Sequence, residues 1–295
     1  MQLLSFSRQG SSDVSWGVRL GEGRVLDVPA ADPQAPATLF DHVSDNGAYD
    51  VAGLMQRADE LSDAVLNESD LTLRAPLRPG KIVGVGLNYV EHVEESSRSL
   101  DTDEELPPRP VLFGTPGTAV IGDQEAIRHN AEMTSMLDWE CELAVVIGTV
   151  TNYDLTEEDA LNHVFGYSIC NDISARDQRR SQRWFFSKGQ DTYKPFGPVL
   201  VTADEIGDPH DLELKLTVNG QQMQHGNTKN MLFKIPTLIA DLASGMTMEP
   251  GDMIATGSPM GVGAAMDPPQ FLQPGDVVEA TIEKIGTLTN PVQAV

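Results

Sequence analysis

The sequence predicts an α+β protein whose core is rich in β-strands. Many short segments are wholly apolar or alternate apolar with polar residues, as strands do, whereas two or three short stretches fit a helix. Two similar turns, Pro250-Gly251-Asp252 and Pro274-Gly275-Asp276, each precede a strand-like segment, DMIATG and DVVEATIEKIG. With 295 residues the chain can form one large domain or two smaller ones.

The first part of the chain, residues 1–75, is predicted to form a small N-terminal α/β subdomain. Strand-like segments occur near residues 3–7, 15–20 and 24–28, and a helical pattern covers about 51–66. The segment APLRPGK that follows is rich in proline and glycine, which is typical of a connector. We therefore expect a second, larger domain over residues 76–295.

The larger domain begins with KIVGVGLNY, a candidate buried strand. Residues 91–105 then contain seven acids and one arginine, and so few apolar side chains that they cannot bury much surface. We expect a mobile lid over residues 91–108. Helices are expected at 157–163, where Thr156 and Asp159 suit a capping box, and at 236–244, which begins with Pro236.

Composition excludes several classes of protein. The net charge of -24 argues against binding nucleic acid or an anionic membrane surface, since both depend on a basic surface. No apolar run approaches the roughly 20 residues of a membrane span, and MQLLSFSRQG does not resemble a signal peptide, so we expect a cytoplasmic protein. The two cysteines exclude a disulfide framework and suit small buried positions.

One segment departs from the acidic background. Residues 170–194 contain six arginines or lysines and three aspartates, which leaves a local charge of +3. The charge count alone is compatible with a solvated helix face and equally with a wall that binds an anion.

The stretch LDWECELAVVIG carries three carboxylates, Asp138, Glu140 and Glu142, at alternate positions before an apolar run. In a strand these side chains would share one face, and like charges so close need a cation or a proton to relieve their repulsion. Carboxylates without nearby histidine or cysteine pairs suit a hard cation that prefers oxygen ligands.

Three further motifs have the residue types of a site, but each is ambiguous alone. NYVEHVEE places His92 and Glu95 three residues apart, a spacing that is also common in surface pairs. NDISARD places Asp172 at the end of an apolar segment, and TGSPMGVG is a glycine-rich loop that could present N–H groups to an anion. GVGLNY has Tyr89 where a dinucleotide fingerprint has its third glycine, so a Rossmann site is excluded.

Taken in order, these motifs resemble the fumarylacetoacetate hydrolase family. The matching elements are VGLNYVEHVEE, LDWECELAVVIG, NDISARD, SKGQDTYKPFGP and TGSPMGVG, from about residue 79 to the C-terminus. The resemblance does not cover the N-terminal 75 residues. It implies the fold of that family, a mixed β-sandwich roll, and a homodimer.

The resemblance also implies a metal site. Glu140, Glu142 and Asp172 match the positions that ligate a divalent cation, usually Mg²⁺ and sometimes Mn²⁺ or Ca²⁺. Asp138 is not among those positions, and we expect it to support the site from outside the ligand set.

The same resemblance implies roles for residues around the metal. His92 and Glu95 would activate water from the lid, and Lys188 would stabilise a developing enolate oxygen. Substrate contacts are expected from the following side chains: Arg176, Arg179, Ser258 and Tyr89. Arg179 stands where the family pattern often has glutamine, so its guanidinium could bind a second carboxylate or turn outward.

These residues lead to a functional hypothesis, a metal-dependent hydrolase that cleaves a C–C bond in 2,4-diketo acids of the acylpyruvate type. Its substrate would be a small anionic 2-keto acid, and water would attack the distal carbonyl to release pyruvate as its enolate. Decarboxylation of a β-keto acid such as oxaloacetate, or enol–keto isomerisation, is the alternative. A third hypothesis is a cation-binding protein without catalytic activity.

Overall fold

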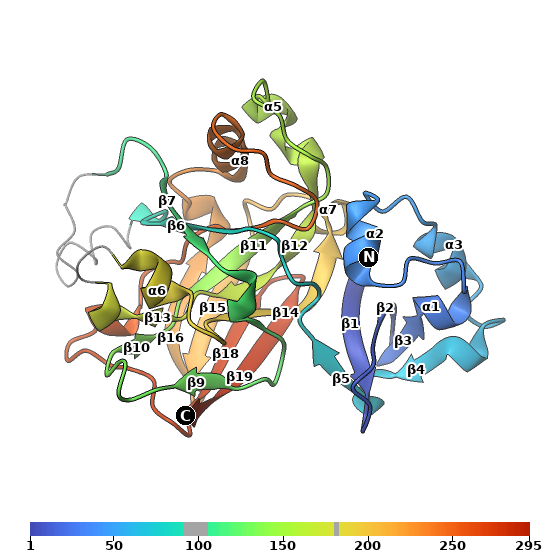
Figure 1. The fold of residues 1–295 in the computed structure, drawn as a ribbon, viewed down its shortest axis with the longest axis horizontal. Helices are drawn as coiled ribbons and strands as arrows, with labels where there is room; N and C mark the ends of the chain where they lie inside the picture. The colour runs from blue at the N-terminus through green and yellow to red at the C-terminus, as the bar shows by residue number, and fades with distance from the viewer. Residues whose placement is uncertain (91–105, 180–182) are drawn as a thin grey trace.

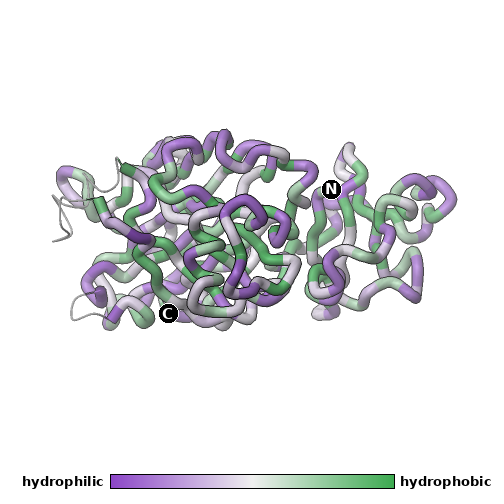
Figure 2. Tube along the Cα trace, turned by 90° about the horizontal axis from the view of Figure 1, so that it is seen from above, coloured by the Kyte–Doolittle hydropathy of each residue, from purple (hydrophilic) through white to green (hydrophobic). Residues whose placement is uncertain are grey.

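The structure, a computed structural model, describes residues 1–90, 106–179 and 183–295 of the chain. Most of the predicted lid lies outside these residues. Figure 1 shows a large body with a smaller N-terminal part beside it, and Figure 2 shows the two lying end to end along the long axis. Strands dominate both parts, which confirms the predicted β-rich α+β class.

The N-terminal part contains five strands and three short helices among the described residues. Its strands are β1 (Gln2–Arg8), β2 (Val14–Gly21), β3 (Arg24–Asp27), β4 (Val65–Asn67) and β5 (Leu71–Arg74). Its helices are α1 (Val28–Ala31), α2 (Leu39–Ser44) and α3 (Val51–Gln56), with 3₁₀ turns at Ser62–Ala64 and Glu68–Asp70. The three strands expected from the sequence are present.

The helix expected over 51–66 is wrong in its second half. The α3 helix closes at Arg57, whose N–H bonds the carbonyls of Leu54 and Met55, and the chain then joins the sheet as β4. Val65 pairs with Leu26 of β3 there, so pairing with a strand distant in sequence overrides the local helical pattern.

One large sheet passes through both parts. Over the described residues its strands follow the order β4-β3-β2-β1-β14-β12-β11-β17-β6-β7, with β5 beside β1 and β8 beside β14. The body contributes β6 (Ile82–Gly86), β7 (Val111–Thr115), β8 (Val120–Ile121), β11 (Cys141–Ile147), β12 (Val164–Asn171), β14 (Lys194–Thr202) and β17 (Met253–Ala255). The two parts join where β1 pairs with β14, at Leu3 opposite Leu200. The domain boundary at residue 75 stays a prediction.

A second sheet covers one face of the first. Its order is β16 (Gln221–Asn227), β15 (Glu213–Val218), β18 (Val277–Ile282), β19 (Gly286–Ala294) and β9 (Ile127–His129). Leu143 and Val145 of β11 share one buried core with Leu216 and Leu288 of this sheet. Alternate residues of β11, such as Ala144, pack into a different core with the N-terminal part. Both faces of β11 are therefore buried, as its unbroken apolar run predicts.

The remaining elements are short. They are β10 (Leu137–Asp138), β13 (Ser174–Ala175), α5 (Glu157–Ala160), α6 (Trp184–Lys188), α7 (Ala203–Ile206) and α8 (Ile235–Ala243). Single 3₁₀ turns occur at Gly117–Ala119, Leu161–His163, Arg176–Gln178, Thr228–Asn230 and Gly263–Ala265. The capping box expected at Thr156 does not form, since its hydroxyl bonds the Asp159 carboxylate and no backbone N–H. No helix in the described part of the chain is long and apolar enough to cross a membrane.

Candidate metal and substrate site

Three buried carboxylates meet where β11 begins and β12 ends. These strands are antiparallel with Cys141 opposite Asn171, so the flanking residues of both strands lie together. Oxygen atoms of Glu140, Glu142 and Asp172 can be chosen that all lie within 4.8 Å of one another. A backbone hydrogen bond also joins two of these residues, because the Asp172 N–H donates to the Glu140 carbonyl at 2.8 Å.

The single strand predicted through Asp138, Glu140 and Glu142 is interrupted. The strand breaks after Asp138, because β10 pairs with β13 while β11 begins only at Cys141. The intervening Trp139 is buried, and its indole N–H donates to the carbonyl of Gly261. Asp138 is not one of the three acids whose oxygens lie within 4.8 Å of one another, although it and Glu140 contact the same guanidinium.

Asp138 instead anchors the surroundings of the cluster. Its carboxylate is fully buried and accepts N–H groups from Gly263 at 2.7 Å and Ala264 at 3.0 Å. It also accepts the Nε–H of Arg176 at 2.8 Å, while Nη2 of the same guanidinium donates to Glu140 at 2.8 Å. Arg176 therefore links Asp138 to Glu140 and fixes the orientation of that carboxylate.

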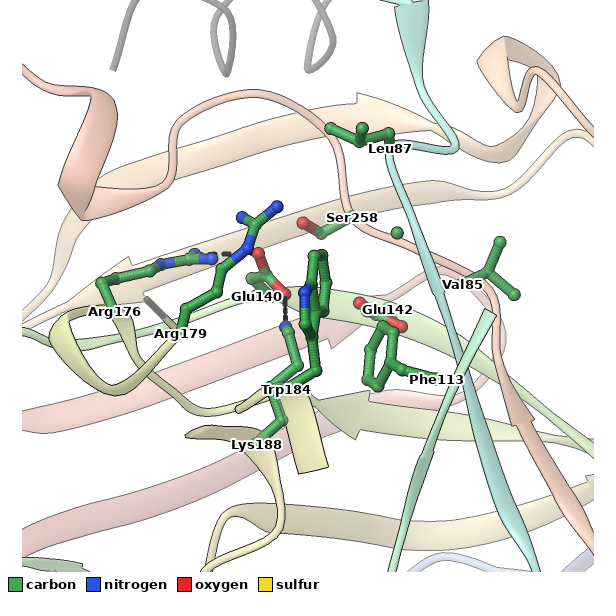
Figure 3. Close-up of a pocket in the computed structure, with 11 residues that line it drawn as sticks. Val85, Leu87, Phe113, Glu140, Glu142, Arg176, Arg179, Trp184, Lys188 and Ser258 are labelled. Carbon is green, nitrogen blue, oxygen red and sulfur yellow. Dashed lines mark hydrogen bonds and ion pairs between the residues drawn. The ribbon is translucent and has the colours of Figure 1, made fainter. Parts of the chain in front are cut away.

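Two lysines also contact the acids, and Figure 3 shows the first of them, Lys188, beside Glu140. Lys188, on α6, places its Nζ 2.5 Å from Glu140 and 2.6 Å from Asp172. Lys194, at the start of β14, forms an ion pair with the other oxygen of Asp172. Both lysines are buried, so their charges and those of the acids are offset within the protein rather than by water.

The pKa values reflect this crowding. Burial opposes the charge of Lys188, but the carboxylates of Asp172 and Glu140 outweigh it and raise the pKa of the lysine. Burial raises the pKa of Glu142 well above its usual range, and the charges of Asp172 and Glu140 raise it further. A divalent cation would relieve this repulsion, and three carboxylates are the donor set that Mg²⁺, Mn²⁺ or Ca²⁺ prefers. The residues present therefore fit the implied metal.

The glycine-rich loop TGSPMGVG does present backbone N–H groups to anions, and the anions are the protein's own carboxylates. The N–H of Gly257 donates to Glu142 at 2.9 Å, as those of Gly263 and Ala264 do to Asp138. Gly257 has φ +94°, and a Cβ there would lie 2.8 Å from that of Asn88, so only glycine fits.

A cavity opens above the cluster. The empty space there is about 330 Å³, which includes open solvent. Glu140, Glu142, Arg176 and Lys188 line it together with these residues: Val85, Gly86, Leu87, Phe113, Arg179, Trp184 and Ser258. The hydroxyl of Ser258 is buried without a hydrogen-bond partner among the described residues, so it is available to a ligand.

The structure brings most of the predicted site residues together. Arg179 and Ser258 line the cavity, although two of the three nitrogens of Arg176 already bond carboxylates. Tyr89 is fully buried in the larger core, with a backbone bridge to Met231, and does not line the cavity. The roles of these residues stay predictions. His92 and Glu95 lie outside the described residues.

Sequence reasoning missed three residues of the site. Phe113 and Trp184 pack with their ring centres 5.5 Å apart and form one wall of the cavity. Neither has a sequence signal beyond being aromatic. Lys194 did have one, because it directly precedes the apolar run PFGPVLV, and a lysine buried in a strand needs an acidic partner.

Comparison with known proteins finds a matching family model, similar proteins and a similar solved structure. Residues 81–293 match the family model described as Fumarylacetoacetate (FAA) hydrolase C-terminal. Oxaloacetate tautomerase YisK of Bacillus subtilis is 38% identical over 94% of this chain and 95% of its own length. The mitochondrial oxaloacetate tautomerase fahd2 of Xenopus laevis is 37% identical over 99% of this chain and 90% of its own length. A solved structure named fumarylacetoacetate hydrolase, from Exiguobacterium antarcticum, covers 100% of both chains with 38% identity and a TM-score of 0.84.

Proposed function

The chain belongs to the fumarylacetoacetate hydrolase family, and from this premise we propose that it is a metal-dependent tautomerase that interconverts the keto and enol forms of oxaloacetate or a similar 2-oxo acid. The family and its fold, both expected from the sequence, are confirmed. The homodimer and the cytoplasmic location stay predictions.

One observation carries this proposal over acylpyruvate hydrolysis. Two relatives named oxaloacetate tautomerase match 94% and 99% of this chain, including the N-terminal part. The acids and lysines of the site would serve either reaction. The isomerase alternative therefore replaces hydrolysis as the first candidate, and hydrolysis of a C–C bond becomes the second, supported by the similar structure named fumarylacetoacetate hydrolase.

Tautomerisation needs proton transfer but consumes no water. Conversion of enol to ketone releases the proton of the C2 hydroxyl to solvent and delivers a proton to C3, so no proton is gained or lost overall. Lys188 lines the cavity as a charged ammonium, and we place its Nζ beside the C2 oxygen, where its charge stabilises the enolate without accepting a proton. Glu140 and Asp172 hold that ammonium in position.

The group that transfers the proton at C3 is proposed to be the pair His92 and Glu95. In this reaction the pair would exchange a proton with C3 instead of activating water. Glu140, Glu142 and Asp172 would hold the divalent cation, which when bound supplies Lewis-acid polarisation of the 2-oxo group. Arg176 acts through Glu140, whose carboxylate it fixes.

The test measures tautomerisation and loss of carbon dioxide in the same reaction. Mg²⁺-loaded protein is mixed with enol-oxaloacetate, and the loss of enol absorbance is recorded beside pyruvate release in a lactate dehydrogenase assay. We expect the enol to disappear faster than in buffer without pyruvate formation. Glu142→Gln is the matched control, since it removes one charge with little change of shape and should abolish the acceleration.

Two results would contradict the proposal. Pyruvate released from oxaloacetate as fast as the enol decays would assign decarboxylation. A kcat/KM for acylpyruvate cleavage well above that for tautomerisation would restore hydrolysis as the main activity.

A further inference from the structure

We propose that Arg179 binds the distal carboxylate of the substrate and makes the site selective for 2-oxo dicarboxylates over 2-oxo monocarboxylates. This inference rests on the proposed function for the identity of the substrate, and it adds the residue that recognises its second charge.

The backbone directs Arg179 into the same cavity as Arg176. The two residues are three apart around the 3₁₀ turn Arg176–Gln178, and the Arg179 N–H donates to the Arg176 carbonyl at 3.2 Å. Side chains three apart on such a turn project from the same side. Arg176 reaches the acid cluster and Arg179 lines the cavity above it (Figure 3).

An aromatic platform holds the Arg179 guanidinium. Its central carbon lies 3.9 Å from the centre of the Trp184 ring, which in turn packs against Phe113. Stacking occupies the face of a guanidinium and leaves its N–H groups at the edge free to bind a planar anion in two places. Of the two orientations open from the sequence, the inward one is present.

Arg179 differs from the other cations of the cavity in its partners. Arg176 and Lys188 each bond two carboxylates, whereas no described acidic side chain forms an ion pair or hydrogen bond with Arg179. Burial and the neighbouring charge of Arg176 lower the pKa of Arg179 to about 10. The guanidinium therefore still carries its charge at neutral pH, and no acid among the described residues pairs with it.

Charge balance points to the same class of ligand. With all four buried acids Asp138, Glu140, Glu142 and Asp172 ionised, as a bound cation requires of its ligands, they face three paired cations, so Arg179 brings the described side chains to neutrality. A divalent cation would then leave two positive charges, which match a dianion such as oxaloacetate. With glutamine in place of Arg179 one positive charge would remain, which matches a monocarboxylate.

The experiment measures binding separately from turnover. Malate and 2-hydroxybutyrate are four-carbon 2-hydroxy acids that cannot tautomerise, and only malate has a distal carboxylate. Their affinities for the Mg²⁺-loaded protein are measured by calorimetry for the wild type, Arg179→Gln and Arg183→Gln. Arg183 is the matched control, because it belongs to the same basic segment but stacks on Phe186 and does not line the cavity.

We expect Arg179→Gln to weaken malate binding about 10- to 100-fold, as a lost hydrogen-bonded ion pair does, with 2-hydroxybutyrate changed less than about threefold. Arg183→Gln should change neither affinity, and thermal unfolding establishes that both variants are folded. Arg179→Lys should recover part of the malate affinity. In turnover, Arg179→Gln should raise KM for oxaloacetate more than it lowers kcat.

Equal losses for both ligands, no loss for either, or a wild type that does not prefer malate would overturn the inference. The outcomes also distinguish a failure of this inference from a failure of the proposed function. A selective site without tautomerase activity would refute only the reaction, and tautomerase activity with unchanged selectivity in Arg179→Gln would refute only the role of Arg179.

Discussion

Replacing Arg176 by methionine should be among the most destabilising single changes in the site. Methionine keeps much of the apolar stem but removes the charge between Asp138 and Glu140, two acids that are 0% and 6% exposed. Removing one partner of a buried ion pair costs about 3–5 kcal/mol, because the other charge stays buried without compensation. Asp138 keeps its backbone N–H donors and Glu140 keeps Lys188, so we expect the lower part of that range.

The free energy of unfolding is measured by urea denaturation, with the slope checked for constancy. Arg109→Met is the control, since it breaks the Arg109–Asp241 pair, whose arginine side chain is 74% exposed, and should have a much smaller effect. Adding Asp138→Asn to Arg176→Met should cost less than the sum of the two single changes, because the neutral side chain leaves less charge unpaired. Additive losses, or a loss in Arg176→Met no larger than in Arg109→Met, would refute this account of the buried network.

Four further changes test other parts of the account. Glu142→Gln should weaken Mg²⁺ binding in calorimetry while circular dichroism stays unchanged; an unaltered affinity would remove Glu142 from the ligand set. Gly257→Ala should lower the free energy of unfolding by about 1–3 kcal/mol in urea, because its φ of +94° and its close neighbours leave no room for a methyl group, and wild-type stability would contradict this. Burial lowers the pKa of His42 below its ordinary 6.5, so folding favours the neutral ring and stability should fall as pH drops below 6.5; His42→Phe should lessen that fall, and parallel pH profiles would rule it out. His92→Ala should slow enol decay by roughly a hundredfold without changing Mg²⁺ affinity, and an unchanged rate would place the group that transfers the proton at C3 elsewhere.

The sequence predicts those parts of the fold that depend on local pattern. The three N-terminal strands follow from alternation, and the strand after each Pro-Gly-Asp turn follows from the turn. The carboxylates Glu140, Glu142 and Asp172 come together as expected, because antiparallel pairing of two apolar runs aligns their polar ends.

What the sequence could not predict depends on contacts between distant segments. The strand breaks at Trp139 because β10 pairs with β13, more than thirty residues later, and no local feature of LDWECELAVV indicates that partner. The helical pattern after Gln56 gives way to pairing with β3 for the same reason. The direction of the Arg179 side chain likewise depends on an aromatic ring five residues further on.

The two lysines inserted among the acids also bear on how the protein is assembled in a cell. Lys188 and Lys194 already offset charge on Glu140 and Asp172, so we expect the site to be folded without an ion. A cation that bound there would compete with an ammonium group for the same oxygens. Its occupancy would then depend on the free concentration of the metal more steeply than at a site of unpaired carboxylates.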